Sequence, residues 1–289
     1  MKKINFKILF VICLLFFANA SAACSKAKVS ALAENSISLE GPEKIIEKND
    51  FKRFFDECKV EGCFVLYDKK ENKFIRYNPK RCAKRFTPAS TFKIPNSLIA
   101  LETGVIKDEN EILKWDGVKR DRAEWNKDQT LDSAFEFSAV WFYQEIARRV
   151  GEERMKKYVN DFAYGNRDVS GGIDQFWLRG NLRISPDEQI TFLRKIHEKT
   201  LPVSERSNDI LKKTMLMENN PNYKLFAKTG AGRNGKKRLG WYTGFVEQNG
   251  NVYYFANNIE AENTNENFMP ARIEIAKKIL NELGLLKGK

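Results

Sequence analysis

Ser90 and Lys93 lie three positions apart within residues 87–95, and together their side chains could carry out nucleophilic chemistry. On a helix, side chains at positions i and i+3 share a face, with Cβ atoms about 5–6 Å apart. A serine hydroxyl needs a base within hydrogen-bond reach before it can attack a carbonyl. The chain contains one histidine, His197, so Lys93 is the nearest candidate base for Ser90.

Lys93 can act as a base only if its surroundings remove its charge. A lysine side chain has a usual pKa of about 10.4 and is protonated at neutral pH. The apolar neighbours Phe92, Ile94 and Ile99 could desolvate the amine, which favours its neutral form. The Ser-x-x-Lys spacing also arises by chance, with Ser90 as the N-cap of a helix. Further partners elsewhere in the chain must therefore support a catalytic interpretation.

The composition predicts a folded protein with a substantial core. Of the 289 residues, 42% are hydrophobic and 12% are aromatic, enough for one large domain or two closely packed ones. The net charge of +12 is spread in runs of mixed sign, without a long basic block. This pattern argues against nucleic-acid binding and favours a basic secreted protein.

The N-terminus has the features of a secretory signal peptide. Three lysines in the first seven residues precede the apolar residues 8–17, and Ala20-Ser21-Ala22 supplies a cleavage pattern. We expect residues 1–22 to be removed on export across the inner membrane into the periplasm, and residues 23–43 to form a flexible leader. Cys24 leaves a lipid anchor open, although a lipoprotein signal would usually have an aliphatic residue in place of the serine. No other segment is long enough to span a membrane.

Three cysteines follow the leader: Cys58, Cys63 and Cys82. Export permits disulfides, but an odd number allows at most one pair among these three. Their spacing fits no metal site, and the single histidine argues further against zinc. We therefore expect structural cysteines and no metal.

The hydrophobic periodicity predicts strands near both ends of the chain and helices in the middle. Expected helices are residues 44–56, 132–150, 152–162, 185–199, 204–217 and 269–283, and expected strands are residues 62–67, 73–77, 223–228, 239–247 and 252–259. The helix that contains Ser90 should run to Thr103, with an irregular or 3₁₀ first turn because Pro95 fits poorly in a regular helix. Residues 164–181 are rich in glycine and indicate a long loop.

Strands from distant parts of the chain must meet in one sheet, so the pattern predicts an α+β fold. We expect an antiparallel sheet flanked by terminal helices, with a mostly helical region inserted between residues about 88 and 220. Residues 44–287 would make up this domain. The functional site should lie where the sheet meets the inserted region, since clefts favour such junctions.

Two further motifs supply partners for Ser90. Ser138-Ala139-Val140 falls within the expected helix 132–150, and Lys228-Thr229-Gly230 comes at the end of an expected strand. Ser-x-x-Lys, a second serine motif and Lys-Thr-Gly together resemble the site of penicillin-binding proteins and β-lactamases. In that arrangement Ser90 attacks a carbonyl, and Ser138 relays a proton to the leaving nitrogen.

The same resemblance implies roles for the strand that carries Lys-Thr-Gly. Lys228 and Thr229 would bind a substrate carboxylate by charge and hydrogen bonding. Gly230 would let the strand backbone approach closely. The backbone N–H groups of Ser90 and Ala231 would form an oxyanion hole.

The order and spacing of the motifs resemble those of class D (oxacillinase-type) β-lactamases. The resemblance covers residues about 44–285 and includes Pro88-Ala89-Ser90-Thr91-Phe92-Lys93, Trp115-Asp116-Gly117, Ser138-Ala139-Val140, Tyr164-Gly165-Asn166, Phe176-Trp177-Leu178, Lys228-Thr229-Gly230 and Trp241-Tyr242-Thr243-Gly244. It implies a β-lactamase/transpeptidase-like fold and a β-lactam antibiotic as the small-molecule partner. The implied activity is hydrolysis of the β-lactam amide through an acyl-serine intermediate, which confers antibiotic resistance.

The resemblance also implies a particular base. In this family the lysine that corresponds to Lys93 takes up CO₂ and becomes N-carboxylated, so no separate cofactor is expected. Val140 would form an apolar wall where other serine β-lactamases and penicillin-binding proteins usually carry asparagine. The indole of Trp177 would donate a hydrogen bond to the carbamate. Arg272 matches the family's arginine for the substrate carboxylate, with a plain surface-helix residue as the alternative.

Some residues depart from the family pattern and leave alternatives open. Ala231 stands where an aromatic residue is common, and residues 231–239 are basic, so the substrate range, carbapenems included, stays undecided. One alternative function is a β-lactam sensor that stays acylated, although such domains are normally attached to a multi-span membrane portion. Another is a D,D-peptidase, which usually has asparagine at the position of Val140. Both a monomer and a homodimer fit the sequence.

Overall fold

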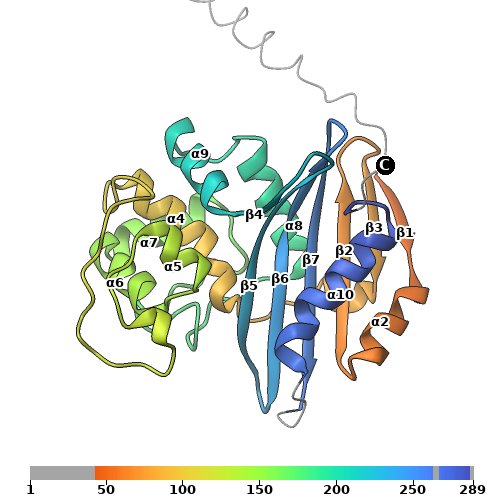
Figure 1. Cartoon of the computed structure of the whole chain (residues 1–289), viewed down its shortest axis with the longest axis horizontal. Coiled ribbons are helices and arrows are strands. Elements are labelled where there is room, and N and C mark those ends of the chain that lie inside the picture. Colours follow the sequence, from red (N-terminus) through yellow and green to blue (C-terminus); the bar gives the residue numbers. More distant parts are fainter. Residues whose placement is uncertain (1–42, 263–266, 287–289) are drawn as a thin grey trace, which may run out of the picture. The chain divides into compact units, whose positions relative to one another are not determined.

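The computed structural model describes residues 43–262 and 267–286. Its central element is a seven-stranded sheet with the strand order β1-β3-β2-β7-β6-β5-β4 (Figure 1). The strands are β1 Lys44–Glu47, β2 Glu61–Asp68, β3 Lys73–Tyr77, β4 Leu216–Asn219, β5 Lys224–Asn234, β6 Lys237–Gln248 and β7 Asn251–Ala261. The predicted signal peptide, the leader up to residue 42 and Cys24 lie outside the described residues.

The sheet joins strands from both ends of the chain, as the sequence predicts. β2 and β7 are antiparallel neighbours, and so are the pairs β2–β3, β5–β6 and β6–β7. β1, however, runs parallel to β3 at one edge, so the sheet is mixed rather than wholly antiparallel. A parallel pair needs a crossover connection, and the segment between β1 and β3 supplies it.

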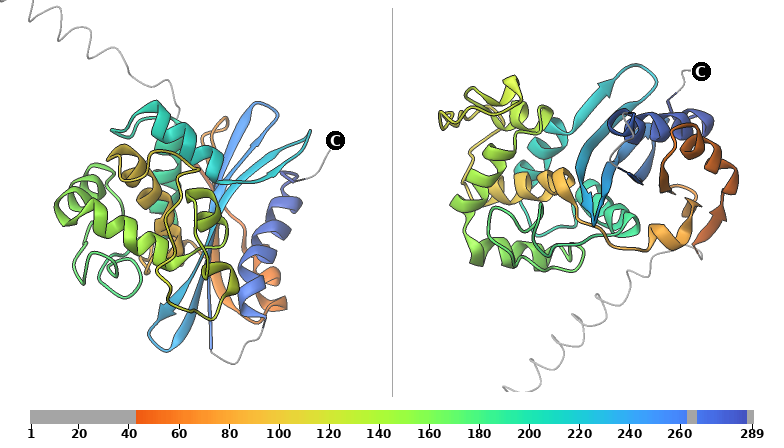
Figure 2. Two further views of the ribbon diagram at one scale, coloured as in Figure 1. Left: turned by 60° about the vertical axis from the view of Figure 1, so that its left-hand side comes forward. Right: turned by 90° about the horizontal axis from the view of Figure 1, so that it is seen from below.

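Helices cover both faces of the sheet (Figure 2). On one face α10 (Phe268–Glu282) packs against β6 and β7 and contacts α2 (Lys52–Glu57). On the other face lies the inserted helical region, where α8 (Pro186–His197) packs against β7 and β2. The remaining helices are η1 Asn49–Phe51, α3 Pro79–Cys82, η2 Ala89–Phe92, α4 Lys93–Glu102, η3 Ala123–Trp125, α5 Leu131–Glu136, α6 Val140–Val150, α7 Glu152–Asp161 and α9 Glu205–Thr214. This arrangement confirms the predicted sheet with terminal helices and a helical insertion.

Three expected helices are wrong in part. Residues 44–56 begin with β1, and only their later part is helical. The expected helix 132–150 is two helices, α5 and α6, separated at Ser138, whose φ of 56° is left-handed. The expected helix 204–217 ends with α9, and the residues that follow pair with β5 as β4. Strand pairing with distant residues decides the boundaries at β1 and β4, and a left-handed residue marks the break at Ser138; local periodicity reveals neither.

For the segments near the motifs, the structure agrees with two predictions from the sequence and differs from one. The 3₁₀ helix η2 confirms the irregular first turn around Ser90. Residues 164–181 contain no helix or strand, and Asn166 Nδ2 closes the loop by donating to Asn181 O at 2.8 Å. Lys228-Thr229-Gly230 does not end a strand, because β5 continues to Asn234 in a long hairpin with β6. Within the described part of the chain, no helix is both long and apolar enough to cross a membrane.

Candidate active site

Ser90 and Lys93 lie at the junction of η2 and α4. Lys93 is the first residue of α4, and its Nζ donates a hydrogen bond to Ser90 Oγ at 3.1 Å. The preceding residue, Ala89, has a φ of 50°, a conformation that few non-glycine residues adopt. Ala89 N donates to Trp177 O at 3.1 Å, which fastens the 164–181 loop to the turn that carries Ser90. The structure therefore places the two residues of Ser-x-x-Lys in direct contact.

Lys93 has no exposed surface. Its Nζ lies 4.8 Å from the centroid of the Tyr143 ring, and the preceding Phe92 stacks on Trp177 with ring centroids 5.4 Å apart. Burial in these surroundings, with the positive charge of Lys228 as a second cause, holds the pKa of Lys93 well below its ordinary value. A neutral amine in this position can accept the Ser90 proton or react with CO₂.

Two of the buried polar atoms that have no hydrogen-bond partner among the described residues belong to Trp177 and Ser138. They are Nε1 of Trp177, a residue without exposed surface, and Oγ of Ser138. A buried donor left unpaired carries a desolvation penalty of about 1–3 kcal/mol. The indole N–H of Trp177 therefore fits an anionic oxygen such as that of a carboxylated Lys93.

The second serine motif is positioned by the contact between α4 and α6. Ser138 lies in the break before α6, and Val140 is the first residue of that helix. Asn96 Nδ2 donates to Tyr143 O at 3.2 Å, and the hydroxyls of Ser97 and Tyr143 are 2.9 Å apart. These bonds hold α6 against the helix that begins with Lys93.

β5 packs against η2 and brings Lys-Thr-Gly to the nucleophile. A Cβ atom on Gly230 would lie 3.1 Å from Trp241 Cβ and 3.2 Å from Pro88 O, so glycine allows this close approach. Lys228 is 4% exposed, and its Nζ lies 5.2 Å from the centroid of the Phe135 ring. β4 pairs with β5 only up to Phe226. The edge of β5 from Lys228 onward is therefore open to a substrate within the described residues.

Lys228, Arg272 and Arg122 are three cations that influence one another. Burial, and after it the charges of Arg272 and Arg122, lower the pKa of Lys228 to about 7. Burial, and after it the charges of Arg122 and Arg238, lower the pKa of Arg272 to about 10. Nε of Arg272 is buried without a partner among the described residues. Mutually repelling, partly desolvated cations favour binding of an anionic group.

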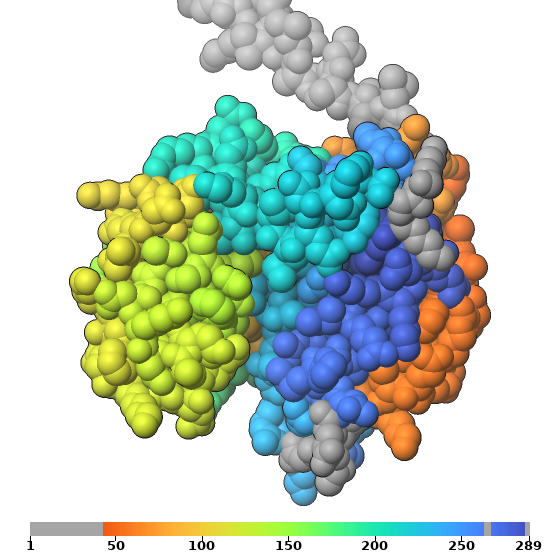
Figure 3. Space-filling view, viewed as in Figure 1, coloured from red at the N-terminus to blue at the C-terminus, as the bar shows by residue number. Residues whose placement is uncertain are grey.

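Two hollows border the open edge of β5. One, of about 170 Å³, is lined by Phe135, Lys228 and Thr229 among others, and a larger one of about 880 Å³ is lined in part by Val140 and Ala231. Figure 3 shows the surface hollowed between the yellow-green segment with α5 and α6 and the blue segment with β5, β6 and α10. Of the predicted site residues, Val140, Lys228, Thr229 and Ala231 thus line hollows of the cleft between the sheet and the helical insertion.

Sequence reasoning missed Arg122 and Tyr143, and it named Leu178 only as part of the Phe176-Trp177-Leu178 motif. Arg122 lies between the expected helix that ends at Thr103 and the one that begins at residue 132, where hydrophobic periodicity cannot place the chain in space. Leu178 directly follows Trp177 and lines the larger hollow with Val140. Tyr143 lies three positions after Val140, about one helical turn away, which is the signal that could have indicated it.

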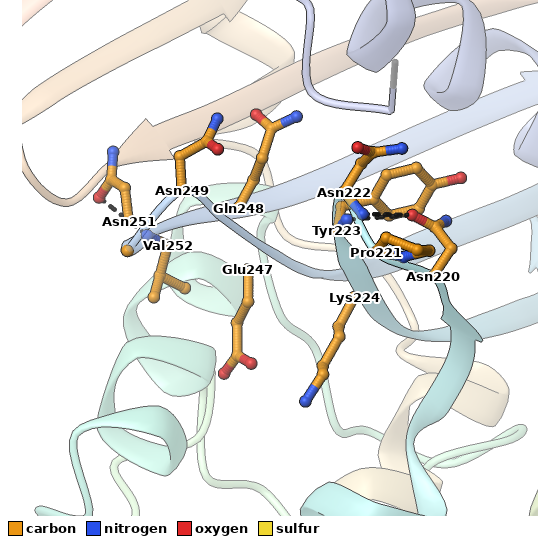
Figure 4. Close-up of a pocket in the computed structure, with 11 residues that line it drawn as sticks. Asn220, Pro221, Asn222, Tyr223, Lys224, Glu247, Gln248, Asn249, Asn251 and Val252 are labelled. Atoms are coloured by element: carbon orange, nitrogen blue, oxygen red, sulfur yellow. Dashed lines mark hydrogen bonds between the residues drawn. The ribbon is translucent and has the colours of Figure 1, made fainter. Parts of the chain in front are cut away.

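A separate pocket of about 370 Å³ lies at the start of β5 and contains none of the predicted site residues (Figure 4). Glu247, which lines it, contacts His197 Nε2 at 3.1 Å. Glu247 has a pKa of about 2. Its hydrogen bond with His197 is the largest cause, and its contact with Lys212 also lowers the pKa, whereas burial acts in the opposite direction. His197 therefore lies partly buried beside Glu247. No disulfide joins Cys58, Cys63 and Cys82 in the described part of the chain, so the single pair that the sequence allows is not formed.

Comparisons with known proteins agree with this geometry. Residues 62–283 match the family described as "Penicillin binding protein transpeptidase domain". The chain is 45% identical to the β-lactamase OXA-48 of Klebsiella pneumoniae over 82% of this chain and 88% of that protein. It is 43% identical to the probable β-lactamase YbxI of Bacillus subtilis, over 80% of this chain and 84% of that protein.

Solved structures give the same result. The class D β-lactamase YbXI from Nostoc matches with a TM-score of 0.80 and 44% identity, over 83% of this chain and all of the other. The class D β-lactamase from Sebaldella termitidis matches with a TM-score of 0.82 and 40% identity, over 85% of this chain and all of the other. The family match over residues 62–283 includes every motif of the cleft. The chain therefore belongs to the class D β-lactamases, a family of serine hydrolases with the penicillin-binding-protein transpeptidase fold.

Proposed function

We propose that this chain hydrolyses the amide bond of β-lactam antibiotics through an acyl-enzyme on Ser90 and so confers resistance to penicillins and related compounds. The observation that carries the proposal is the 3.1 Å contact between Ser90 Oγ and Nζ of the fully buried Lys93. A serine with a desolvated amine in reach is an activated nucleophile. The relatives named above are themselves β-lactamases by name, which supports the choice of substrate.

During acylation, different groups of the cleft carry out different steps. Ser90 Oγ attacks the lactam carbonyl while its proton passes to the base at Lys93. The N–H groups of Ser90 and Ala231 stabilise the oxyanion. The C–N bond then breaks, and the Ser138 hydroxyl delivers a proton to the leaving nitrogen, a role supported by its buried, unpaired Oγ.

The substrate carboxylate is held beside the part of β5 that precedes Ala231. Lys228 and Thr229 contact it from the strand, and Arg272 contacts it from α10. A carboxylate between Lys228 and Arg272 offsets the burial and the neighbouring positive charges that lower the pKa of both cations. The same anchoring orients the lactam carbonyl toward Ser90.

We also propose that Lys93 is N-carboxylated by CO₂. A neutral buried amine, the apolar side chain of Val140 and the unpaired Nε1 of Trp177 support this assignment. When carboxylated, Lys93 supplies an anionic base for Ser90 and for the water that releases the product. Trp177 holds the carboxylate oxygen, and Val140 excludes a competing polar group.

The N-terminal features support export of the enzyme. We propose that residues 1–22 are removed and that residues 23–43 link the membrane-proximal end to the catalytic domain, residues 44–287, in the periplasm. Cys24 is the candidate site of a lipid anchor. Metabolic labelling with a radioactive fatty acid, with Cys24→Ser as the control, distinguishes an anchored from a free periplasmic enzyme.

The proposed activity is tested by steady-state turnover of a chromogenic cephalosporin, with and without bicarbonate. We expect sustained turnover that rises with bicarbonate and is lost in Lys93→Ala. Lys156→Ala, which changes an exposed lysine of α7, is the matched control and should keep full activity.

A burst equal to the enzyme concentration, followed by a stable acyl-protein in mass spectrometry, would contradict the proposal. It would show that Ser90 is acylated but that deacylation fails. That result would favour a β-lactam sensor or a penicillin-binding protein instead.

A further inference from the structure

Three arginines line the end of the larger hollow that lies beyond Ala231. They are Arg179, Arg233 and Arg238, which border the hollow of about 880 Å³ together with Val140, Leu178 and Ala231. None of the described residues that line this hollow is acidic. Positive charge therefore gathers at one end of the hollow.

The backbone holds these arginines close to one another. Arg233 and Arg238 are directly opposite residues of the β5–β6 hairpin. Directly opposite side chains of a strand pair are neighbours, so both guanidinium groups lie at the same end of the hollow. Arg238 lies with its guanidinium carbon 4.6 Å from the centroid of the Phe268 ring, and Arg233 Nη1 donates to Lys236 O at 3.5 Å.

Arg179 approaches the same hollow from the opposite wall. It follows Trp177 and Leu178 in the 164–181 loop, and its N–H donates to Gln175 O at 2.9 Å. Its side chain is exposed. The loop that carries Trp177 thus brings a third guanidinium to the cleft.

The direction of β5 determines which part of a substrate reaches these arginines. This step rests on the proposed function, in which the substrate carboxylate lies at Lys228 and Thr229 and the scissile carbonyl at the Ala231 N–H. The acyl side chain on the far side of that carbonyl then continues along β5 past Gly232 to Arg233.

We propose that this end of the cleft is an anion-binding subsite for the acyl side chain, so that the enzyme prefers β-lactams whose side chain carries a carboxylate or sulfonate. A guanidinium binds such groups through paired, charge-assisted hydrogen bonds. The partly exposed setting suits selectivity among side chains rather than binding of the common lactam core.

The test compares benzylpenicillin with carbenicillin, which differ by one carboxylate on the acyl side chain. We expect kcat/KM to be about tenfold higher for carbenicillin, the size of one charge-assisted contact. In Arg233→Gln/Arg238→Gln the ratio of the two kcat/KM values should fall about tenfold, and in Arg179→Gln it should fall in the same direction. Added NaCl should lower the wild-type ratio by screening.

Arg149→Gln is the matched control, because this exposed arginine of α6 pairs with Glu145 outside the cleft. It should leave the ratio unchanged. Equal kcat/KM values for the two penicillins in the wild type, or a ratio that the double substitution does not alter, would overturn the subsite. Absence of turnover for both penicillins would instead overturn the proposed function on which it rests.

Discussion

The amine of Lys93 lies 3.1 Å from the hydroxyl of Ser90, inside a pocket that leaves the lysine no exposed surface. Both features are needed, because contact alone would leave a protonated lysine that cannot accept a proton. Burial lowers the pKa of the amine, and the residues around the pair determine what it can do.

Trp177→Phe should make the activity depend on added bicarbonate. Phenylalanine keeps the stacking on Phe92 but removes the N–H that fits a carboxylated Lys93. We expect kcat at ambient CO₂ to fall by about 100-fold, as for loss of one well-placed donor, with partial recovery in bicarbonate. Trp141→Phe is the control, since its Nε1 already donates to Trp125 O at 2.9 Å. Full activity of Trp177→Phe without bicarbonate would rule out this role.

The pH dependence of kcat/KM should show an alkaline limb that belongs to Lys228. Its pKa of about 7 means that the free enzyme loses this cation as the pH rises through neutrality, which weakens carboxylate binding. Arg122→Gln removes one neighbouring positive charge, raises the Lys228 pKa and should move the limb to higher pH. Arg149→Gln should leave the limb in place. A limb that does not move in Arg122→Gln would show that another group titrates.

Ser138→Gly should make the protein more stable and less active. Ser138 has a left-handed φ of 56° and a buried hydroxyl without a partner among the described residues, and glycine relieves both features. We expect Ser138→Gly to be more stable than Ser138→Ala by about 1 kcal/mol in urea denaturation. Both variants should lose about 100-fold in kcat, because each removes the proton relay. Equal stability of the two variants would show that this backbone conformation is not strained.

Gly165→Ala should destabilise the protein and disturb the loop that carries Trp177. Gly165 has a φ of 53°, and a Cβ atom there would overlap Arg183 O. We expect a loss of about 3 kcal/mol in the free energy of unfolding. Gly235→Ala is the matched control, because Gly235 also has a positive φ, of 60°, but a Cβ atom there meets nothing within 4 Å. It should lose only about 1 kcal/mol, and losses of the same size in both variants would contradict a steric cause at Gly165.

Local patterns predicted much of the fold. Three features lie within a few residues of the signals that indicate them. They are the hairpin of β2 and β3, the 3₁₀ turn at Ser90 and the capping box that opens α8. In that capping box the side chains of Ser185 and Glu188 each cap the other's backbone. The predictions fail where pairing with a distant segment determines the structure. The sequence predicts a helix where β1 lies, because the pairing of β1 with β3 leaves no local signal. β5 continues past Gly230 because β6 pairs with it throughout.

The sequence by itself determined which side chains are proposed to do the chemistry, because Ser90 and Lys93, the Ser138 motif and Lys-Thr-Gly are short segments whose residue types and spacing are sufficient to recognise them. Only the tertiary structure decided the lowered pKa of Lys93, the N–H of Trp177 without a partner among the described residues and the approach of Arg122 to Lys228. Those properties depend on burial and on the distance between residues far apart in the chain, and both arise only when the helical insertion packs against the sheet.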